Sequence, residues 1–405
     1  MLVQGSKIKV KRKNRYLPDC CFEFRVGWDL ETRNGFIGCP TSEDKRKSVL
    51  SYNHNMSRMK TVPVIKWANT PLGEIPIVDT ALTFNDRLGF LKMRFAVGRM
   101  DYALSPGLYG IGSPLPESPV FVTSNYRMTF DILRSNLSGI DSLILVLDTR
   151  GINVWCAAGE GYFGTEELLK RIDSVGLSRV VSHRILILPQ LGAPGISAHE
   201  VRGKSGFTVV YGPIEARDIP SFLKRGMEAT EKMRRVTFAM DQRISLVPVE
   251  LVTAARYLVP AAIFFLLLSG FSKGEFHLVR IMRPGVLNMF LFSLGVLAGA
   301  VVVPLFLPWI PSRLFSVKGA LLGILFTAIF GFFLGDYHRM YGSWFSGISW
   351  FLIIPSLGSV MAMNFTGSTT FTSLSGVKKE ISLSLLPQIV VMAGGLILWI
   401  AGMFA

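Results

Sequence analysis

Apolar residues are unevenly distributed along this chain, and the pattern separates two regions near residue 250. Before that point, short apolar runs alternate with polar and glycine-rich segments. After Leu251, apolar residues dominate and charged residues become rare. Runs of about 18 or more mostly apolar residues are typical of membrane-spanning helices. The sequence therefore predicts about five spans, at residues 251–270, 286–309, 314–335, 343–363 and 384–404.

The region before residue 250 has the alternating pattern of an α/β domain. Residues 143–148 form an apolar run typical of a central strand in a parallel sheet, and residues 152–155 continue in an extended pattern. The other predicted strands are residues 118–123, 184–188 and 208–211, and short helices separate the strands from one another. We therefore predict a doubly wound, Rossmann-like α/β domain over residues 61–250. A basic extension (residues 1–60) precedes it, and an all-α transmembrane domain (residues 251–405) follows.

Ligands of doubly wound folds bind where the carboxyl ends of the strands meet. Three loops rich in turn-forming residues converge there, at residues 148–164, 188–195 and 211–213. The first loop contains a G-x-G-x-x-G pattern, which in dinucleotide-binding proteins precedes a helix that binds pyrophosphate. The next strand ends in Leu188-Pro189 instead of an acidic residue, and Glu160 and Glu166 bring negative charge to the loop. Both features weaken the dinucleotide interpretation.

The first loop also contains Cys156, which follows Trp155 and precedes two alanines and a glycine. A cysteine here can be a packed core thiol, a nucleophile or a metal ligand. A nucleophile needs a histidine base, and the nearby His183 and His199 lie in no recognisable catalytic context. The other cysteines, Cys20, Cys21 and Cys39, are too few and too irregularly spaced for a disulfide framework or a four-cysteine metal site. Small residues beside Cys156 indicate that something bulky approaches the thiol, which suits a large flat cofactor.

The net charge of +15 does not indicate nucleic-acid binding, because no recognition motif accompanies it. The basic residues gather in the first sixty residues and near the first predicted span, where Arg234, Arg235, Arg243 and Arg256 would face anionic lipid headgroups. Residues 7–13 are basic, but no apolar segment follows them, so no signal peptide is predicted. We expect a multi-pass protein of the cell inner membrane whose α/β domain is cytoplasmic.

Residues 153–159, with the sequence N-V-W-C-A-A-G, resemble the signature of the mercury-methylation corrinoid protein family. That family consists of membrane-anchored relatives of the large corrinoid iron–sulfur subunit of the acetyl-CoA pathway. The resemblance spans about residues 60–405. Further segments resemble the family in the same order, at residues 106–109, 118–126, 145–149, 188–195, 210–213, 307–309 and 363–380.

The resemblance implies a cobalamin-type corrinoid, bound base-off, with Cys156 as the lower axial ligand of cobalt. It implies that Asn153 and Trp155 shape a capping helix, that Thr123 lies against the corrin, and that the 188–195 loop borders the nucleotide tail. The other predicted cofactor contacts are Ala157, Ala158, Gly159, Leu191, Gly192, Ala193, Tyr211 and Gly212.

The reaction implied by the resemblance is a corrinoid-dependent methyl transfer. A methyl group passes from a folate-type donor to Co(I), and from methyl-Co(III) to Hg(II), giving methylmercury. The implied partners are a small ferredoxin with two 4Fe–4S clusters and a methyltetrahydrofolate-type methyl donor protein. Two alternatives remain: a corrinoid methyl carrier of one-carbon or acetyl-CoA-pathway metabolism with another acceptor, and a nucleotide-binding membrane module.

The chemistry of the residues agrees with a corrinoid. A thiolate is a soft, strongly donating ligand for a transition metal, and it favours departure of a methyl group with its electron pair. The chain also lacks the D-x-H-x-x-G motif that supplies histidine in other cobalamin domains. One position departs from the family signature, because Glu160 stands where the family has lysine. A carboxylate four residues from Cys156 on a helix disfavours the thiolate, so we expect weaker or more pH-dependent ligation.

Residues 364–380 are polar and rich in serine, threonine and glycine. They form either a solvated loop or a docking surface for the α/β domain or a ferredoxin. A route for a soft metal through the membrane would need thiols, and no cysteine follows Cys156. We therefore predict that the apolar region serves as anchor and docking platform instead of a transport path.

Overall fold

The computed structural model describes residues 62–71, 73–98, 102–331, 343–369, 372 and 374–404. The predicted basic extension, with Cys20, Cys21 and Cys39, lies outside these residues. The described residues divide into two compact units, one up to Gly89 and from Gly98 to Arg235, and one of Phe90–Val97 with the described residues from Val236 onward. The division at Arg235 falls before the predicted boundary at residue 250, because the first long apolar helix already begins at Met240.

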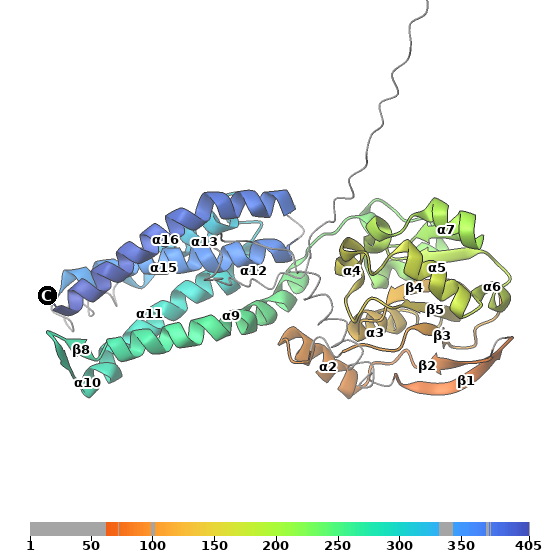
Figure 1. The fold of residues 1–405 in the computed structure, drawn as a ribbon, viewed down its shortest axis with the longest axis horizontal. Helices are drawn as coiled ribbons and strands as arrows, with labels where there is room; N and C mark the ends of the chain where they lie inside the picture. Colours follow the sequence, from red (N-terminus) through yellow and green to blue (C-terminus); the bar gives the residue numbers. More distant parts are fainter. Residues whose placement is uncertain are drawn as a thin grey trace, which may run out of the picture. The chain divides into compact units, whose positions relative to one another are not determined.

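The first unit is built on one mixed seven-stranded sheet (Figure 1). The strand order is β1-β2-β3-β5-β4-β6-β7. β1 pairs antiparallel with β2, and β3 pairs antiparallel with β5, whereas all other neighbours are parallel. The strands span Val64–Thr70 (β1), Gly73–Val78 (β2), Gly107–Ile111 (β3), Val120–Ser124 (β4), Ser142–Leu147 (β5), Ile185–Leu188 (β6) and Thr208–Tyr211 (β7).

The four parallel strands have the arrangement that positions a ligand site. From β4 the chain first moves outward to β5, then returns to the other side of β4 to form β6 and β7. The strand order therefore reverses between β4 and β6. In open α/β sheets a crevice forms at this switch point, outside the carboxyl ends of the strands. The predicted α/β sheet domain followed by a helical region is confirmed, with a mixed sheet in place of a wholly parallel one.

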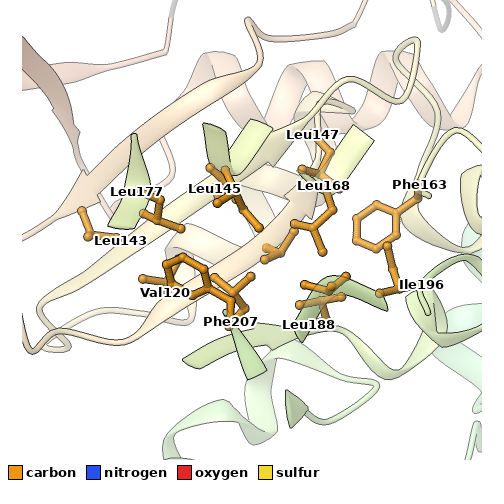
Figure 2. Close-up of a cluster of buried hydrophobic side chains, with 14 of the residues drawn as sticks. Val120, Leu143, Leu145, Leu147, Phe163, Leu168, Leu177, Leu188, Ile196 and Phe207 are labelled. Carbon is orange, nitrogen blue, oxygen red and sulfur yellow. The ribbon is translucent and has the colours of Figure 1, made fainter. Parts of the chain in front are cut away.

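Helices cover both faces of the sheet. The side chains of β5 point alternately to the two faces and pack against the helices on each. Leu143, Leu145 and Leu147 join one apolar cluster, and the alternate residues Ile144 and Val146 join a second cluster. Figure 2 shows the first cluster, with Leu143 at its left end and Phe163 at its right end. The helices over the first cluster are α5 (Thr165–Ser174), α6 (Leu177–Val180) and α7 (Ala198–Ser205), and those over the second are α3 (Arg127–Ser135) and α8 (Ile219–Lys224).

A closed network of four buried charges joins α3 to α2 (Phe84–Arg94). Arg127 bonds to Asp86 at 2.9 Å and to Asp131 at 2.8 Å. Arg134 bonds to the remaining oxygens of Asp86 and Asp131, each at 2.7 Å. All four side chains are at most 7% exposed, so each charge depends on its partners for solvation.

Among the residues that the structure describes, the second unit contains four helices long and apolar enough to cross a membrane: Met240–Leu268, Leu278–Phe306, Trp344–Phe365 and Gly376–Phe404. They correspond in position to four of the five predicted spans. The remaining span, predicted at residues 314–335, contains the shorter apolar helix α13 (Phe315–Ile329), and residues 332–342 are outside the described part.

These helices depart from uniform α geometry at identifiable places. The second long helix comprises α10 (Leu278–Arg280), α11 (Val286–Leu297) and α12 (Val303–Phe306), which are separated by the π-helical segments η6 (Ile281–Gly285) and η7 (Ala298–Val302). Pro284 lies within η6, and Pro304 follows η7. A proline has no N–H to donate, which favours such local rearrangements of the helix. The other elements are α9 (Met240–Leu268), β8 (Phe271–Ser272), β9 (Glu275–Phe276), α15 (Trp344–Phe365), η8 (Thr366–Ser368) and α16 (Leu374–Phe404).

Glycines allow α13 and η7 to approach α15 closely. A Cβ on Gly319 would lie 2.1 Å from the carbonyl oxygen of Gly358, and a Cβ on Gly299 would lie 2.2 Å from the same oxygen. Gly319 and Gly323 form a G-x-x-x-G pair, the spacing that brings helix backbones together in membranes.

We expect Gly319→Leu to destabilise the helical unit by about 1–3 kcal/mol, because the added side chain meets backbone that cannot move aside. Thermal unfolding of the full chain in detergent measures this effect. Gly394→Leu is the matched control, since a Cβ there meets nothing within 4 Å. Equal unfolding temperatures for the two variants would contradict the close approach.

Three buried charges surround the connection between α12 and α13. Arg243 donates to the carbonyl oxygens of Pro304 (3.3 Å) and Leu305 (2.5 Å), and Lys318 donates to that of Ile310 at 2.9 Å. A carboxylate oxygen of Glu380 accepts from the backbone N–H of Ser316 at 2.6 Å, in the first turn of α13. The two cationic side chains thus bind carbonyl oxygens at and after the end of α12, and the carboxylate of Glu380 binds an N–H group at the start of α13.

Arg243 therefore does not have the exposed, lipid-facing position that the charge pattern predicted. It is only 4% exposed, because its guanidinium group satisfies carbonyl oxygens at the end of α12. Arg234, Arg235 and Arg256 are exposed, as a role at lipid headgroups requires. Residues 370, 371 and 373 of the predicted docking segment lie outside the described part of the chain.

Candidate functional site

Cys156 lies in a short helix, α4 (Val154–Glu160), that follows the carboxyl end of β5. Asn153 begins this helix, and its side-chain oxygen accepts from the backbone N–H of Cys156 at 3.0 Å. Gly161 ends the helix in the left-handed conformation, with φ of +84°. The extended conformation predicted for residues 152–155 is wrong beyond Asn153, because an asparagine in extended conformation is a strong helix N-cap.

The turn between β5 and α4 is held by side chains from distant parts of the chain. Asn125, directly after β4, is fully buried, and its side-chain oxygen accepts from the N–H groups of Thr149 (3.1 Å) and Gly151 (2.9 Å). Glu167 of α5 accepts from the N–H of Asp148 at 2.9 Å. The sequence did not predict that Asn125 or Glu167 holds this turn. The signals for Asn125 were its place in the 118–126 segment and its position at the carboxyl end of a buried strand.

The exposure of α4 differs around its circumference. Val154, Ala157 and Ala158 belong to the apolar cluster of the domain. Trp155 is 39% exposed, and Cys156 is 6% exposed and outside that cluster. The thiol thus lies at the margin between the core and the surface of the domain.

Neither nearby histidine is placed as a base for Cys156. The ring of His183 bonds through Nε2 to the carbonyl of Ser118 at 2.9 Å, and its Nδ1 accepts from the N–H of Ile185 at 3.2 Å. His199 bonds through Nδ1 to the hydroxyl of Ser197 at 3.1 Å. Of the interpretations that the sequence left open for the thiol, the nucleophile with a histidine base therefore has no geometric support.

The small residues after Cys156 have a structural reason within the domain. The 3₁₀ segment η3 (Gln190–Gly195) packs against α4, and a Cβ on Gly195 would lie 3.2 Å from the Cα of Ala158. A Cβ on Gly192 would lie 2.5 Å from the Phe163 ring. Leu191 and Ala193 of the same segment are partly buried. The structure thus brings the predicted residues of η3 together with α4, and small side chains allow this contact.

A cavity of about 170 Å³ lies at the carboxyl ends of β4, β6 and β7. Its walls are mostly apolar and include Thr123 of β4, Val154 at the start of α4, and Gly212 after β7. The cavity therefore occupies the switch point between β4 and β6, where a ligand site is expected. Tyr211 holds the adjacent loop, because its hydroxyl donates to the carbonyl of Ile196 at 3.1 Å.

Only some of the residues predicted to contact the cofactor line this cavity. Thr123 and Gly212 line it, whereas Cys156, Asn153, Trp155 and the residues of η3 do not. α4 connects the two groups, since Val154 reaches the cavity two residues before Cys156.

The glycine pattern does not form a phosphate-binding loop. In a dinucleotide fingerprint the glycines lead directly from a strand into a helix. Here α4 intervenes, and Gly159 lies within it. A Cβ on Gly164 would lie 2.6 Å from the carbonyl oxygen of Gly161, so this glycine serves a tight turn before α5.

Glu160 is the last residue of α4 and stands one helical turn after Cys156. The two residues therefore lie on the same helix, four positions apart, as the sequence predicted. Lysine in place of Glu160 would change the charge at this position by two units. At this spacing in a partly dry site, the change alters the electrostatic energy of the thiolate by about 1–3 kcal/mol. For the corrinoid that the resemblance implies, with Cys156 as its cobalt ligand, we expect Glu160→Lys to strengthen thiolate ligation and to make it less dependent on pH. Visible spectra of the corrinoid-reconstituted chain across pH measure this; identical bands for both proteins would contradict it.

Comparison with known proteins gives a match over part of the chain, before residue 235. Residues 89–223 match the family model described as CO dehydrogenase/acetyl-CoA synthase delta subunit. The matched region includes β3 to β7, α4 and the cavity, but excludes the whole apolar region after residue 235.

Individual relatives agree with this match. The acetyl-CoA decarbonylase/synthase complex subunit gamma of Methanocaldococcus jannaschii is 33% identical over 132 residues, which are 32% of this chain and 27% of that protein. The corresponding subunit of Archaeoglobus fulgidus is 30% identical over 135 residues, covering 33% and 28%. That of Methanopyrus kandleri is 32% identical over 124 residues, covering 30% and 26%. The chain thus spans about a quarter of the length of these relatives.

The relation to proteins of the acetyl-CoA pathway, which the resemblance implied, is confirmed. Mercury is not named in these relatives, so mercury methylation stays a prediction. The roles predicted for individual site residues likewise stay predictions.

Proposed function

We propose that the sheet domain binds a corrinoid and that the chain carries a methyl group as a corrinoid-dependent methyltransferase. The observation that carries this proposal is the placement of Cys156. The thiol lies on a short helix that is held at both ends and whose first residue, Val154, lines a cavity at the switch point of the sheet. The segment also lies within the region that matches the acetyl-CoA synthase subunit family.

The residues present fit such a cofactor. Cys156 offers a soft donor of the kind that transition metals prefer, and among the described residues no cluster of three or more His, Cys, Asp or Glu offers another metal site. Trp155, which precedes Cys156 in α4, is 39% exposed and offers a flat, mostly apolar ring. The cavity lined by Thr123 and Gly212 provides mostly apolar space for part of the cofactor.

Each residue has a role that follows from its position. Cys156 would hold cobalt through its thiolate, and Asn153 would fix the backbone that presents the thiol. Thr123 and Gly212 would contact the cofactor from the carboxyl ends of β4 and β7, and η3 would border it through Leu191, Gly192 and Ala193. When bound, the corrinoid supplies a cobalt ion that accepts and releases a methyl group.

The relatives favour a methyl carrier of one-carbon or acetyl-CoA-pathway metabolism over a protein that transfers the methyl group to another kind of acceptor. Their names describe subunits of an acetyl-CoA decarbonylase/synthase complex, which favours protein partners for this chain as well. A methyltetrahydrofolate-type donor protein and a small ferredoxin with two 4Fe–4S clusters are the partners that we propose. A nucleotide-binding membrane module is less well supported, because the glycine pattern forms no phosphate loop.

Mercury(II) is the second candidate acceptor. It is favoured by the N-V-W-C-A-A-G segment around Cys156 and by the apolar unit, which the matches to the complex subunits do not cover. We further propose that the apolar helices anchor the chain in the inner membrane with the sheet domain in the cytoplasm.

One experiment separates the proposed acceptors. The full chain, purified in detergent, is reconstituted with corrinoid, reduced and methylated, and then offered either Hg(II) or an acetyl-CoA synthase preparation. Bound corrinoid with methyl transfer to the synthase supports the carrier, and transfer to Hg(II) alone supports mercury methylation. Failure to bind corrinoid would contradict both.

A further inference from the structure

The turn that leads into α4 is unusually constrained. Its four consecutive N–H groups, at residues 148–151, all donate to side-chain oxygens. Two of them share the side-chain oxygen of Asn125, which directly follows the neighbouring strand β4. Arg150 has a positive φ of +58°, a conformation that a non-glycine residue keeps only when its surroundings impose it.

We infer that Asn125 is the positioning residue that orients α4 and thereby presents the Cys156 thiol. This inference rests on the proposed function and deepens it. α4 has only seven residues, too few to be stable without tertiary support, so the contacts at its ends determine its direction. Asn125 fixes the turn before the helix, and after it the N–H of Phe163 donates to the carbonyl of Ala157 at 3.0 Å.

The chemistry of the amide suits this position better than that of a carboxylate. While the oxygen of Asn125 accepts from the turn, its Nδ2 faces Oδ1 of Asp148 at 3.4 Å. An aspartate at position 125 would keep the acceptor but would bring a second carboxylate against Asp148 in a buried site. A serine would retain a polar group too short to span the same distance. Both variants should therefore impair the turn, with alanine impairing it most.

The first test uses the protein without corrinoid. In a full chain with Cys20, Cys21 and Cys39 changed to serine, Cys156 is the sole thiol. Because Cys156 is buried, alkylation by a maleimide requires local opening of α4. Asn125→Ala should accelerate alkylation at least about tenfold, the effect of losing one or two net hydrogen bonds. Amide hydrogen exchange at Thr149 and Gly151 should accelerate with it.

The matched control is Asn136→Ala, which removes an amide that donates to the carbonyl of Ile132 at the end of α3. It should leave the alkylation rate of Cys156 unchanged. Equal alkylation and exchange rates in Asn125→Ala and Asn136→Ala would overturn the inference. Should Asn125→Ala fail to fold, Asn125→Ser provides the same comparison.

The second test uses the corrinoid-loaded chain. Asn125→Ala should retain bound corrinoid but show a visible spectrum in which thiolate ligation is weakened, whereas Asn136→Ala should show the wild-type spectrum. Asn125→Ala with a lowered melting temperature but an unchanged spectrum would mean that the residue is structural only, and would overturn the inference. Since the alkylation test needs no corrinoid, failure of the proposed function is distinguishable from failure of this positioning role.

Discussion

Replacing Cys156 with alanine is expected to abolish thiolate ligation of cobalt and to lower methyl transfer by at least about 100-fold. Mutation of groups that merely support a metal ligand already costs roughly 10–100-fold, so loss of the ligand itself should cost at least as much. The side chain is small and outside the apolar cluster, so the fold should survive the change. Visible spectra and methyl-transfer rates of the reconstituted full chain measure both effects.

The control for this experiment is Cys39→Ala, which removes a thiol from the chain before the sheet domain. It should leave the spectrum and the rate unchanged. If Cys156→Ala and Cys39→Ala behave alike, the thiol of Cys156 is not the ligand, and its burial reflects packing alone.

The second large effect is expected at the buried charge network. Asp86→Asn should destabilise the sheet domain by about 3–5 kcal/mol, the usual cost of removing one partner from a buried ion pair. Asp86 bonds to both Arg127 and Arg134, so its neutralisation leaves two guanidinium groups with Asp131 as their remaining acidic partner in the network. Denaturant unfolding of the full chain, followed by a signal from the sheet domain, measures the loss.

The pH dependence of this effect follows from the pKa of Asp86. Burial raises that pKa, but hydrogen bonds from Thr83 and the charges of Arg134 and Arg127 outweigh burial and lower it below 3.8 overall. A pKa depressed by folding stabilises the fold above the unfolded value, and the contribution is lost as pH falls through the folded value. The difference between wild type and Asp86→Asn should therefore persist at neutral pH and shrink below about pH 3.8.

Asp173→Asn is the matched control for Asp86→Asn, because Asp173 is an exposed aspartate near the end of α5. It should change stability by less than about 0.5 kcal/mol. A comparable loss in both variants would show that the charge network contributes little to folding.

Much of the parallel half of the sheet could be predicted from apolar runs. The run at residues 143–148 became β5 (Ser142–Leu147), and the runs at 184–188 and 208–211 became β6 and β7. β1, β2 and β3 were missed for physical reasons. β1 is largely exposed, β2 contains Pro76, and β3 contains two glycines, so none of them shows the periodicity of a half-buried strand.

The parts of the candidate site that lie within one short segment could be predicted from the sequence, whereas the contacts between distant segments could not. Cys156 and its N-cap Asn153 lie three residues apart, so one segment contains the whole motif. Asn125 contacts residues 24 and 26 positions away, and no local pattern reports such a contact. The cavity likewise depends on the strand order between β4 and β6, which only the folded sheet reveals.

Cobalt X-ray absorption spectroscopy of the reconstituted full chain shows whether Cys156 binds cobalt. We expect one sulfur atom in the first coordination sphere of cobalt in the wild-type chain and none in Cys156→Ala. A cobalt coordinated only by nitrogen and oxygen in both proteins, or a chain that retains no corrinoid, would contradict it.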